Sequence, residues 1–163
     1  MKLFTSSLIL IMTLFIMTCA FASERKDKHT QRNEMHSCGT PTDPAGEFVT
    51  GVHVKKNWLL CSDEFDTPRV GGTENFRNKT ELWQIEDRFV PILQCLPGSA
   101  VTGIHVDRKA LACAPIIPPI TMPLTYFPDR GVTQREGMHA CPKGYPLAGI
   151  NVKENILLCG AQY

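Results

Sequence analysis

Two histidines and one asparagine occupy the same position in three similar stretches of the chain. His53, His105 and Asn151 each follow a Gly-Val or Gly-Ile pair, and each is followed by Val. Imidazole and amide groups can hydrogen-bond a hydroxyl or an amide of a ligand, so we predict a ligand-binding position presented once per stretch. The alternative is that these side chains only bond neighbouring loops, as most polar groups on strands do.

A short polar turn follows each of these positions and extends the candidate site. Asn57, Lys109 and Asn155 close the three turns. Asn is well suited to the left-handed backbone position of a three-residue hairpin loop. We therefore count these turn residues among the predicted ligand-binding residues.

Six cysteines accompany the three stretches, two to each. They are Cys38, Cys61, Cys95, Cys113, Cys141 and Cys159. An even number of cysteines in an exported chain is typical of a disulfide framework. Among the possible pairings, the stretches favour Cys38–Cys61, Cys95–Cys113 and Cys141–Cys159. Pairing between different stretches is the alternative.

The histidines and cysteines do not favour a metal site, and the motifs of common enzyme classes are absent. His36 and His139 stand two positions before a cysteine, but cysteines that form disulfides are not zinc ligands. The chain lacks the G-x-S-x-G and H-E-x-x-H motifs and a phosphate-binding glycine loop. We therefore predict no metal and no cofactor, and a protein that is not an enzyme.

The three stretches are copies of one pattern, which predicts a domain built from repeats. From a shared Gly onward they align without a gap. The repeats span residues 35–61, 92–113 and 138–159.

Each repeat predicts a β-hairpin whose first strand has a polar and an apolar face. In the first repeat, Thr50, Val52 and Val54 form the face expected in the core, with Val49 and His53 opposite. A Gly recurs within each first strand, which indicates a bulge or the close approach of another backbone; a bulge would move Val49 to the core face. The return strands are apolar on both faces, so the first strand is expected to be the outer one.

The predicted fold is all-β, with three disulfide-closed hairpin repeats packed with pseudo-threefold symmetry, as in a trefoil or a prism. A linear row of three units is the alternative. This domain, residues 35–163, follows a signal peptide over 1–22 and a flexible charged leader over 23–34. Between the repeats, residues 81–90 favour a strand, and the prolines of 115–128 exclude helix and most central strands.

The unit also resembles the disulfide-looped repeats of dermatopontin-like matrix and agglutinating proteins. The resemblance lies in the Gly-containing strand followed by an apolar strand that ends in Cys. Those repeats carry an Asp-Arg-x-Trp segment before the closing Cys, of which only Asp107-Arg108 is present here, in one copy. The resemblance implies an extracellular adhesion or agglutinin role and transfers no site residue.

The charge balance and the signal peptide bear on the possible partners and on the localisation. Removal of the signal peptide takes Lys2 from 17 basic residues, leaving 16 against 16 acidic ones. This balance favours neither nucleic acid nor an anionic membrane as partner, and we predict no membrane span in the mature chain. The localisation expected is secreted: extracellular, or periplasmic in a bacterium.

We predict a secreted binding protein that recognises an extracellular ligand at several equivalent positions, with a glycan as the lectin-like candidate. One alternative is an effector or inhibitor that docks on a protein partner through residues 40–46 or 115–128. Another is a structural matrix or coat protein. The sequence leaves the oligomeric state open.

Overall fold

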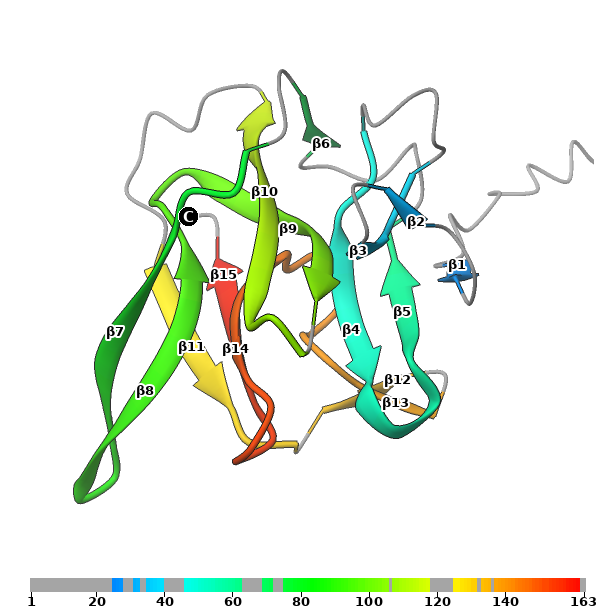
Figure 1. Ribbon diagram of the computed structural model, residues 1–163. Coiled ribbons are helices and arrows are strands. Elements are labelled where there is room, and N and C mark those ends of the chain that lie inside the picture. The colour runs from blue at the N-terminus through cyan, green and yellow to red at the C-terminus, as the bar shows by residue number, and fades with distance from the viewer. Residues whose placement is uncertain are drawn as a thin grey trace, which may run out of the picture.

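The computed structural model describes most of the chain from Arg25 to Ala161. The described residues are 25–27, 31–32, 35–39, 46–62, 69–71, 75–105, 107–117, 125–131, 133–135 and 137–161. They form fifteen β-strands, one short 3-10 turn and no α-helix (Figure 1), which confirms the all-β prediction. The predicted signal peptide, residues 1–22, lies outside the described residues.

The strands form three five-stranded sheets, in which neighbours in space are often distant in sequence. Across sheet 1 the order is β1 (Arg25–Asp27), β5 (Trp58–Cys61), β4 (Val49–His53), β13 (Met138–Ala140) and β12 (Gln134–Arg135). Across sheet 2 it is β2 (Gln31–Arg32), β3 (Met35–Ser37), β9 (Ser99–His105), β10 (Ala110–Ile117) and β6 (Arg69–Val70). Across sheet 3 it is β11 (Thr125–Asp129), β15 (Ile156–Ala161), β14 (Leu147–Asn151), β8 (Arg88–Cys95) and β7 (Asn78–Ile85).

Each sheet combines one hairpin with strands from two other parts of the chain. The hairpins β4–β5, β9–β10 and β14–β15 lie at the centres of the sheets. We call the strands that precede the opening cysteines, β3, β8 and β13, the lead strands. Lead strand β13 pairs with β4, β3 with β9, and β8 with β14. No lead strand therefore pairs with the hairpin that directly follows it.

This pairing corrects the expectation that the first strand of each hairpin is the outer one. Strands β4, β9 and β14 each have a neighbour on both sides, and their residues are almost all buried. The physical reason is that an uncovered first strand would expose a row of unpaired backbone groups. The lead strands cover that edge.

A glycine in each first strand permits the close approach of a lead strand. A Cβ added to Gly51 would lie 2.6 Å from Ala140 Cβ, one on Gly103 2.8 Å from Ser37 Oγ, and one on Gly149 2.7 Å from the Leu93 oxygen. Real Cβ atoms do not approach other atoms so closely, so these positions require glycine.

The strand register also shifts beside these glycines, as the bulge interpretation expects. The shifts fall between Val49 and Gly51, between Leu147 and Gly149, and on β10 opposite Gly103. Val49 and Val52 consequently both enter the central core, so the first assignment of Val49 to the outer face was wrong. Val54 was also expected in the core, but it begins the turn η1 (Val54–Lys56) and is 37% exposed.

Three disulfides lie in the centre of the molecule. They join Cys38 to Cys61, Cys95 to Cys113 and Cys141 to Cys159, the pairs that the sequence favours. All six belong to one buried cluster with aliphatic side chains from the three hairpins. A common core therefore connects the three sheets.

Several segments outside the hairpins differ from expectation or refine it. Within the predicted flexible leader, β1 pairs with β5 and β2 pairs with β3. Such short edge strands need only backbone partners, so they carry no apolar periodicity.

The predicted strand within 81–90 is confirmed by the ribbon β7–β8. Pro115, however, lies within β10, a non-edge strand, opposite Ser99.

Candidate ligand-binding cleft

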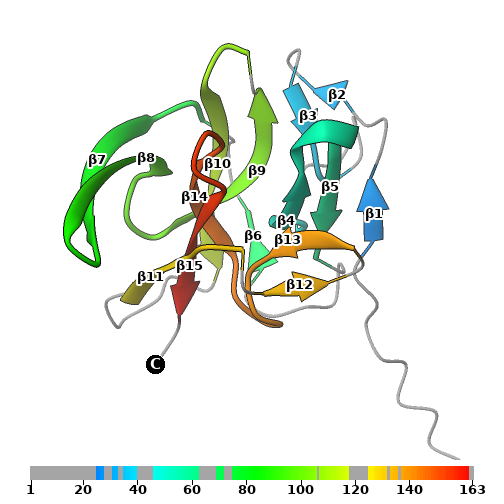
Figure 2. The same ribbon diagram turned by 90° about the horizontal axis from the view of Figure 1, so that it is seen from below.

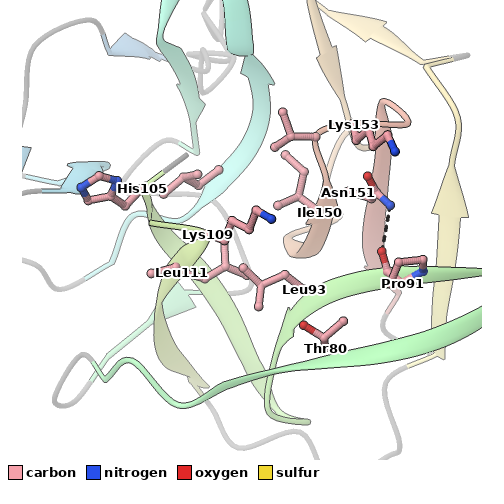
Figure 3. A pocket seen from close by; sticks show the side chains of 12 residues that line it. Thr80, Pro91, Leu93, His105, Lys109, Leu111, Ile150, Asn151 and Lys153 are labelled. Atoms are coloured by element: carbon pink, nitrogen blue, oxygen red, sulfur yellow. Dashed lines mark hydrogen bonds between the residues drawn. The ribbon is translucent and has the colours of Figure 1, made fainter. Parts of the chain in front are cut away.

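A cleft of about 560 Å³ opens between hairpins β9–β10 and β14–β15 and the ribbon β7–β8. Its floor is aliphatic and includes Leu93, Leu111 and Ile150, while Lys109 and Asn151 supply polar groups (Figure 3). The three hairpin turns lie at the same end of the molecule, the lower end in Figure 1, and Figure 2 views them from below. The cleft thus lies where segments distant in sequence meet, a common place for ligand sites.

The predicted turn residues adopt the conformation that their position requires. Asn57, Lys109 and Asn155 have φ values of 52°, 48° and 54°, which is the left-handed region. Asn tolerates this region and Lys does so less readily. The turns therefore hold their polar side chains at fixed places beside the strands.

His105 and Asn151 both stabilise their own turns. The backbone N–H of Arg108 donates to His105 Nδ1 at 3.2 Å, and that of Glu154 donates to Asn151 Oδ1 at 3.0 Å. Asn151 Nδ2 also donates to the Pro91 carbonyl at 2.8 Å. In Figure 3 the His105 ring lies at the margin of the cleft, away from Asn151. These contacts are those of the alternative in which the side chains bond neighbouring loops.

His53 lies in different surroundings from its two counterparts. The centroids of the His53 and Trp58 rings lie 6.2 Å apart, in an edge-to-face arrangement. Lys56 Nζ lies 4.8 Å from the Trp58 ring centroid. His53, Asn57 and Trp58 line a hollow of only about 10 Å³. The hollow and the cleft share Ile104 and Ile150, so they meet in the middle of the turn end.

The structure therefore brings some of the predicted site residues together and separates others. His105, Lys109 and Asn151 line the cleft, whereas His53 and Asn57 line the small hollow. Asn155 lines neither and instead places its Oδ1 3.2 Å from His139 Nδ1. Whether any of the six binds a ligand stays a prediction.

A buried polar network around Asp129 was missed in the sequence. His139 Nε2 lies 2.8 Å from Asp129 Oδ1, and Thr133 Oγ1 donates to Asp129 Oδ2 at 2.6 Å. The backbone N–H of Gly131 donates to Asp129 Oδ1 at 3.0 Å. Burial acts to raise the pKa of Asp129, but the hydrogen bonds from Thr133 and His139 outweigh it and hold that pKa below its ordinary value.

The network is placed to fix a turn. Through His139, it connects β11 and β13 to Asn155 in the β14–β15 turn. Within the described part of the chain, no group of three or more His, Cys, Asp or Glu side chains is arranged to hold a metal ion. The Asp-x-Gly-x-Thr spacing, typical of a turn in which Asp accepts backbone hydrogen bonds, was the available sequence signal.

Several residues that line the cleft are not among those predicted from the sequence. Leu93 and Pro91 come from β8. Leu93 stands at the start of the second repeat, and Pro91 lies between that repeat and the strand predicted over 81–90. Lys153 lies in the β14–β15 turn. Nothing in the repeat pattern indicates that β8 lies beside β14. That pairing became visible only with the sheet order.

Comparisons with protein-family models, with curated proteins and with solved structures found no match for this chain. Among the described residues, no helix has the length and apolar character needed to cross a membrane.

Proposed function

We propose that this chain is a secreted binding protein, and that its ligand enters the cleft beside the β9–β10 and β14–β15 turns. The observation that carries the proposal is the cleft itself. Its volume of about 560 Å³ falls within the range of small-molecule sites, roughly 300–1,000 Å³. An aliphatic floor with a few polar groups at the mouth is the usual composition of such sites. Three buried disulfides are compatible with export to an oxidising compartment.

We propose one principal site in place of several equivalent ones. The space beside His53 is occupied by Trp58, whereas the space beside His105 and Asn151 is open. Carbohydrate binding stays among the candidates to be tested. The loops suggested for a protein-docking effector fall largely outside the described residues, since residues 40–45 and 118–124 are not among them.

We also propose that the chain is a threefold repeat of one five-stranded unit. Support comes from equivalent pairings: Gly51 with Ala140, Gly103 with Ser37, and Gly149 with Gln94. Within each unit, moreover, β1, β6 and β11 pair with the return strand of the hairpin that follows them, β5, β10 and β15. Lead strands exchanged in a ring would give a closed, prism-like arrangement.

The binding proposal is tested by nuclear magnetic resonance on the oxidised, isotope-labelled chain from residue 23 to residue 163. A panel of sugars, aliphatic acids, aromatic fragments and short peptides is added, and backbone amide shifts are recorded. We expect one class to shift the amides of Leu93, Lys109, Ile150 and Lys153. Ala110, on β10, also lines the cleft. Filling the cleft with Ala110→Trp should abolish those shifts.

The matched control is Gln134→Trp, which adds the same indole on edge strand β12, outside the cleft. It should leave the shifts unchanged. Shifts that map elsewhere, or that persist in Ala110→Trp, would contradict the proposed site. A panel that produces no shifts at all would contradict it as well.

A further inference from the structure

The floor of the cleft matches a hydrocarbon chain better than a sugar. Leu93, Ile104, Leu111 and Ile150 line it, and no Trp, Tyr or Phe is among the lining residues. Sugar rings are generally held by stacking on aromatic faces, whereas aliphatic side chains complement methylene groups. Leu111, Ile104 and Ile150 are also part of the central core, so the floor is a rigid surface.

An apolar strip continues from this floor along one face of the ribbon β7–β8. Pro91, which lines the cleft, pairs across the ribbon with Leu82, and Phe89 lies two residues further along β8. Leu82 is 69% exposed and Phe89 is 67% exposed. The opposite face of the ribbon, with Val90 and Ile92, is buried. The exposed strip therefore extends the path available to a long apolar ligand.

The mouth of the cleft is basic. Lys109 and Lys153 stand on the two turns that border it, and Lys109 points towards Ile150 between the two hairpins (Figure 3). Neither lysine forms an ion pair with another described residue. The acid next to Lys153, Glu154, is bound by Arg88.

Basic residues are concentrated at this end of the molecule. Lys55 and Lys56 lie in the β4–β5 turn, and Arg108 lies beside Lys109 in the β9–β10 turn. The acids of the three hairpin turns are Asp107 and Glu154. The chain without its signal peptide has 16 basic and 16 acidic residues, so this excess is local. A local cationic surface attracts anions even when the whole protein is neutral.

We propose that the cleft binds a free single-chain amphiphile with an anionic head group, of the fatty-acid class. The chain lies on Leu93, Ile104 and Ile150 and continues towards Pro91, while the head group lies at Lys109 and Lys153. This inference rests on the proposed binding function and adds the class of ligand. Charge complementarity at the mouth and aliphatic walls behind it are the two properties that such a ligand requires.

The test uses the oxidised chain from residue 23 to residue 163, which includes β1 and β2, and the fluorescence of dansyl-labelled undecanoic acid. We expect saturable binding of one probe per chain, and displacement of the probe by dodecanoate. Replacing both lysines, Lys109→Gln with Lys153→Gln, should weaken dodecanoate binding about tenfold. The same variant should bind dodecanol, which has no charge, as well as the unaltered protein does.

Two further variants make the result specific. Lys55→Gln with Lys56→Gln removes the same charge from the remaining turn, whose lysines do not line the cleft, and should weaken dodecanoate binding far less than the change at Lys109 and Lys153 does. Ala110→Trp should abolish binding of both the acid and the alcohol. Probe binding that does not saturate, or that is equal in all variants, would overturn the proposal.

A vesicle experiment distinguishes a free amphiphile from the same head group in a bilayer. Phosphatidylcholine vesicles with and without phosphatidylserine are sedimented with the protein, and we expect no association with either. Association with anionic vesicles without binding of free dodecanoate would refute the inference. If the fragment panel finds another ligand class in the cleft and dodecanoate fails, the inference falls and the binding function stands.

Discussion

At the scale of single residues, Asp129 shows how a polar network fixes a turn. Its carboxylate accepts hydrogen bonds from Thr133 and Gly131 and pairs with His139, which in turn contacts Asn155. The residues involved lie on two sheets and in the connection between them. Loss of the carboxylate should therefore loosen the β14–β15 turn that borders the cleft.

We predict that Asp129→Asn lowers the free energy of unfolding at neutral pH by about 1–3 kcal/mol. Because the folded-state pKa of Asp129 lies below its ordinary value of 3.8, the carboxylate stabilises the fold above that value. The contribution is lost as the pH falls through the lowered pKa, so the variant and the unaltered protein should converge in strong acid. Urea denaturation across this pH range measures the difference.

Asp87→Asn is the control for this prediction, because Asp87 is exposed in the turn of the ribbon β7–β8. It should change the free energy of unfolding little at any pH. A difference between Asp129→Asn and the unaltered protein that stays constant down to strong acid would contradict the role given to the carboxylate.

Roles that depend on sequence neighbours could be predicted, whereas contacts between residues far apart in the sequence could not. The left-handed turn positions of Asn57 and Asn155 depend on a few neighbouring residues, so the pattern contains them. The contact between Asp129 and His139 depends on how an irregular connection runs, which no local pattern encodes. The same holds for Asn151 and Pro91, which are far apart in sequence.

At the scale of elements, the ribbon β7–β8 has two faces with different roles. Ile85, Val90 and Ile92 pack into a buried cluster with residues of β14 and β15. Leu82 and Phe89 lie exposed on the other face. One face therefore attaches the ribbon to the domain, and the other is available to a ligand.

We predict that Ile92→Ala lowers the free energy of unfolding by about 2–4 kcal/mol, because Ile92 is fully buried. Leu82→Ala, on the exposed face of the same ribbon, should change it by less than about 0.5 kcal/mol. Urea denaturation of the two variants gives both values. Equal losses would contradict the assignment of the faces.

The hairpins could be predicted from the sequence, whereas the way in which they combine could not. Apolar alternation and a polar turn are local signals, and each predicted hairpin is present. The lead strands β3 and β13 have only three residues each. A segment so short carries no information about its partner, which is chosen by the packing of the whole domain.

At the scale of the molecule, the three disulfides belong to one core rather than to three separate units. All six cysteines contact the same buried cluster, to which the three hairpins contribute. The sequence favoured the correct pairs because each pair closes one local stretch. Their convergence in a common centre required the sheet order, which the sequence left open.

We predict that the double variant Cys141→Ala with Cys159→Ala lowers the free energy of unfolding by about 3 kcal/mol. The loss should be shared across the domain, since the cysteines touch a core common to the three sheets. Hydrogen exchange should then accelerate for protected amides in β4 and β9 as well as in β14. Acceleration confined to β14 and β15 would show that the units unfold independently.

The pairing of β13 with β4 determines when the domain can be completed during biosynthesis. A nascent chain emerges from its N-terminus, so hairpin β4–β5 is made long before residues 138–140 exist to cover its edge. Until then the backbone groups along β4 are open to pairing with other chains. Final closure of sheet 1 must therefore follow synthesis of nearly the whole described chain, and a product truncated before β13 keeps an uncovered edge that can pair with other chains.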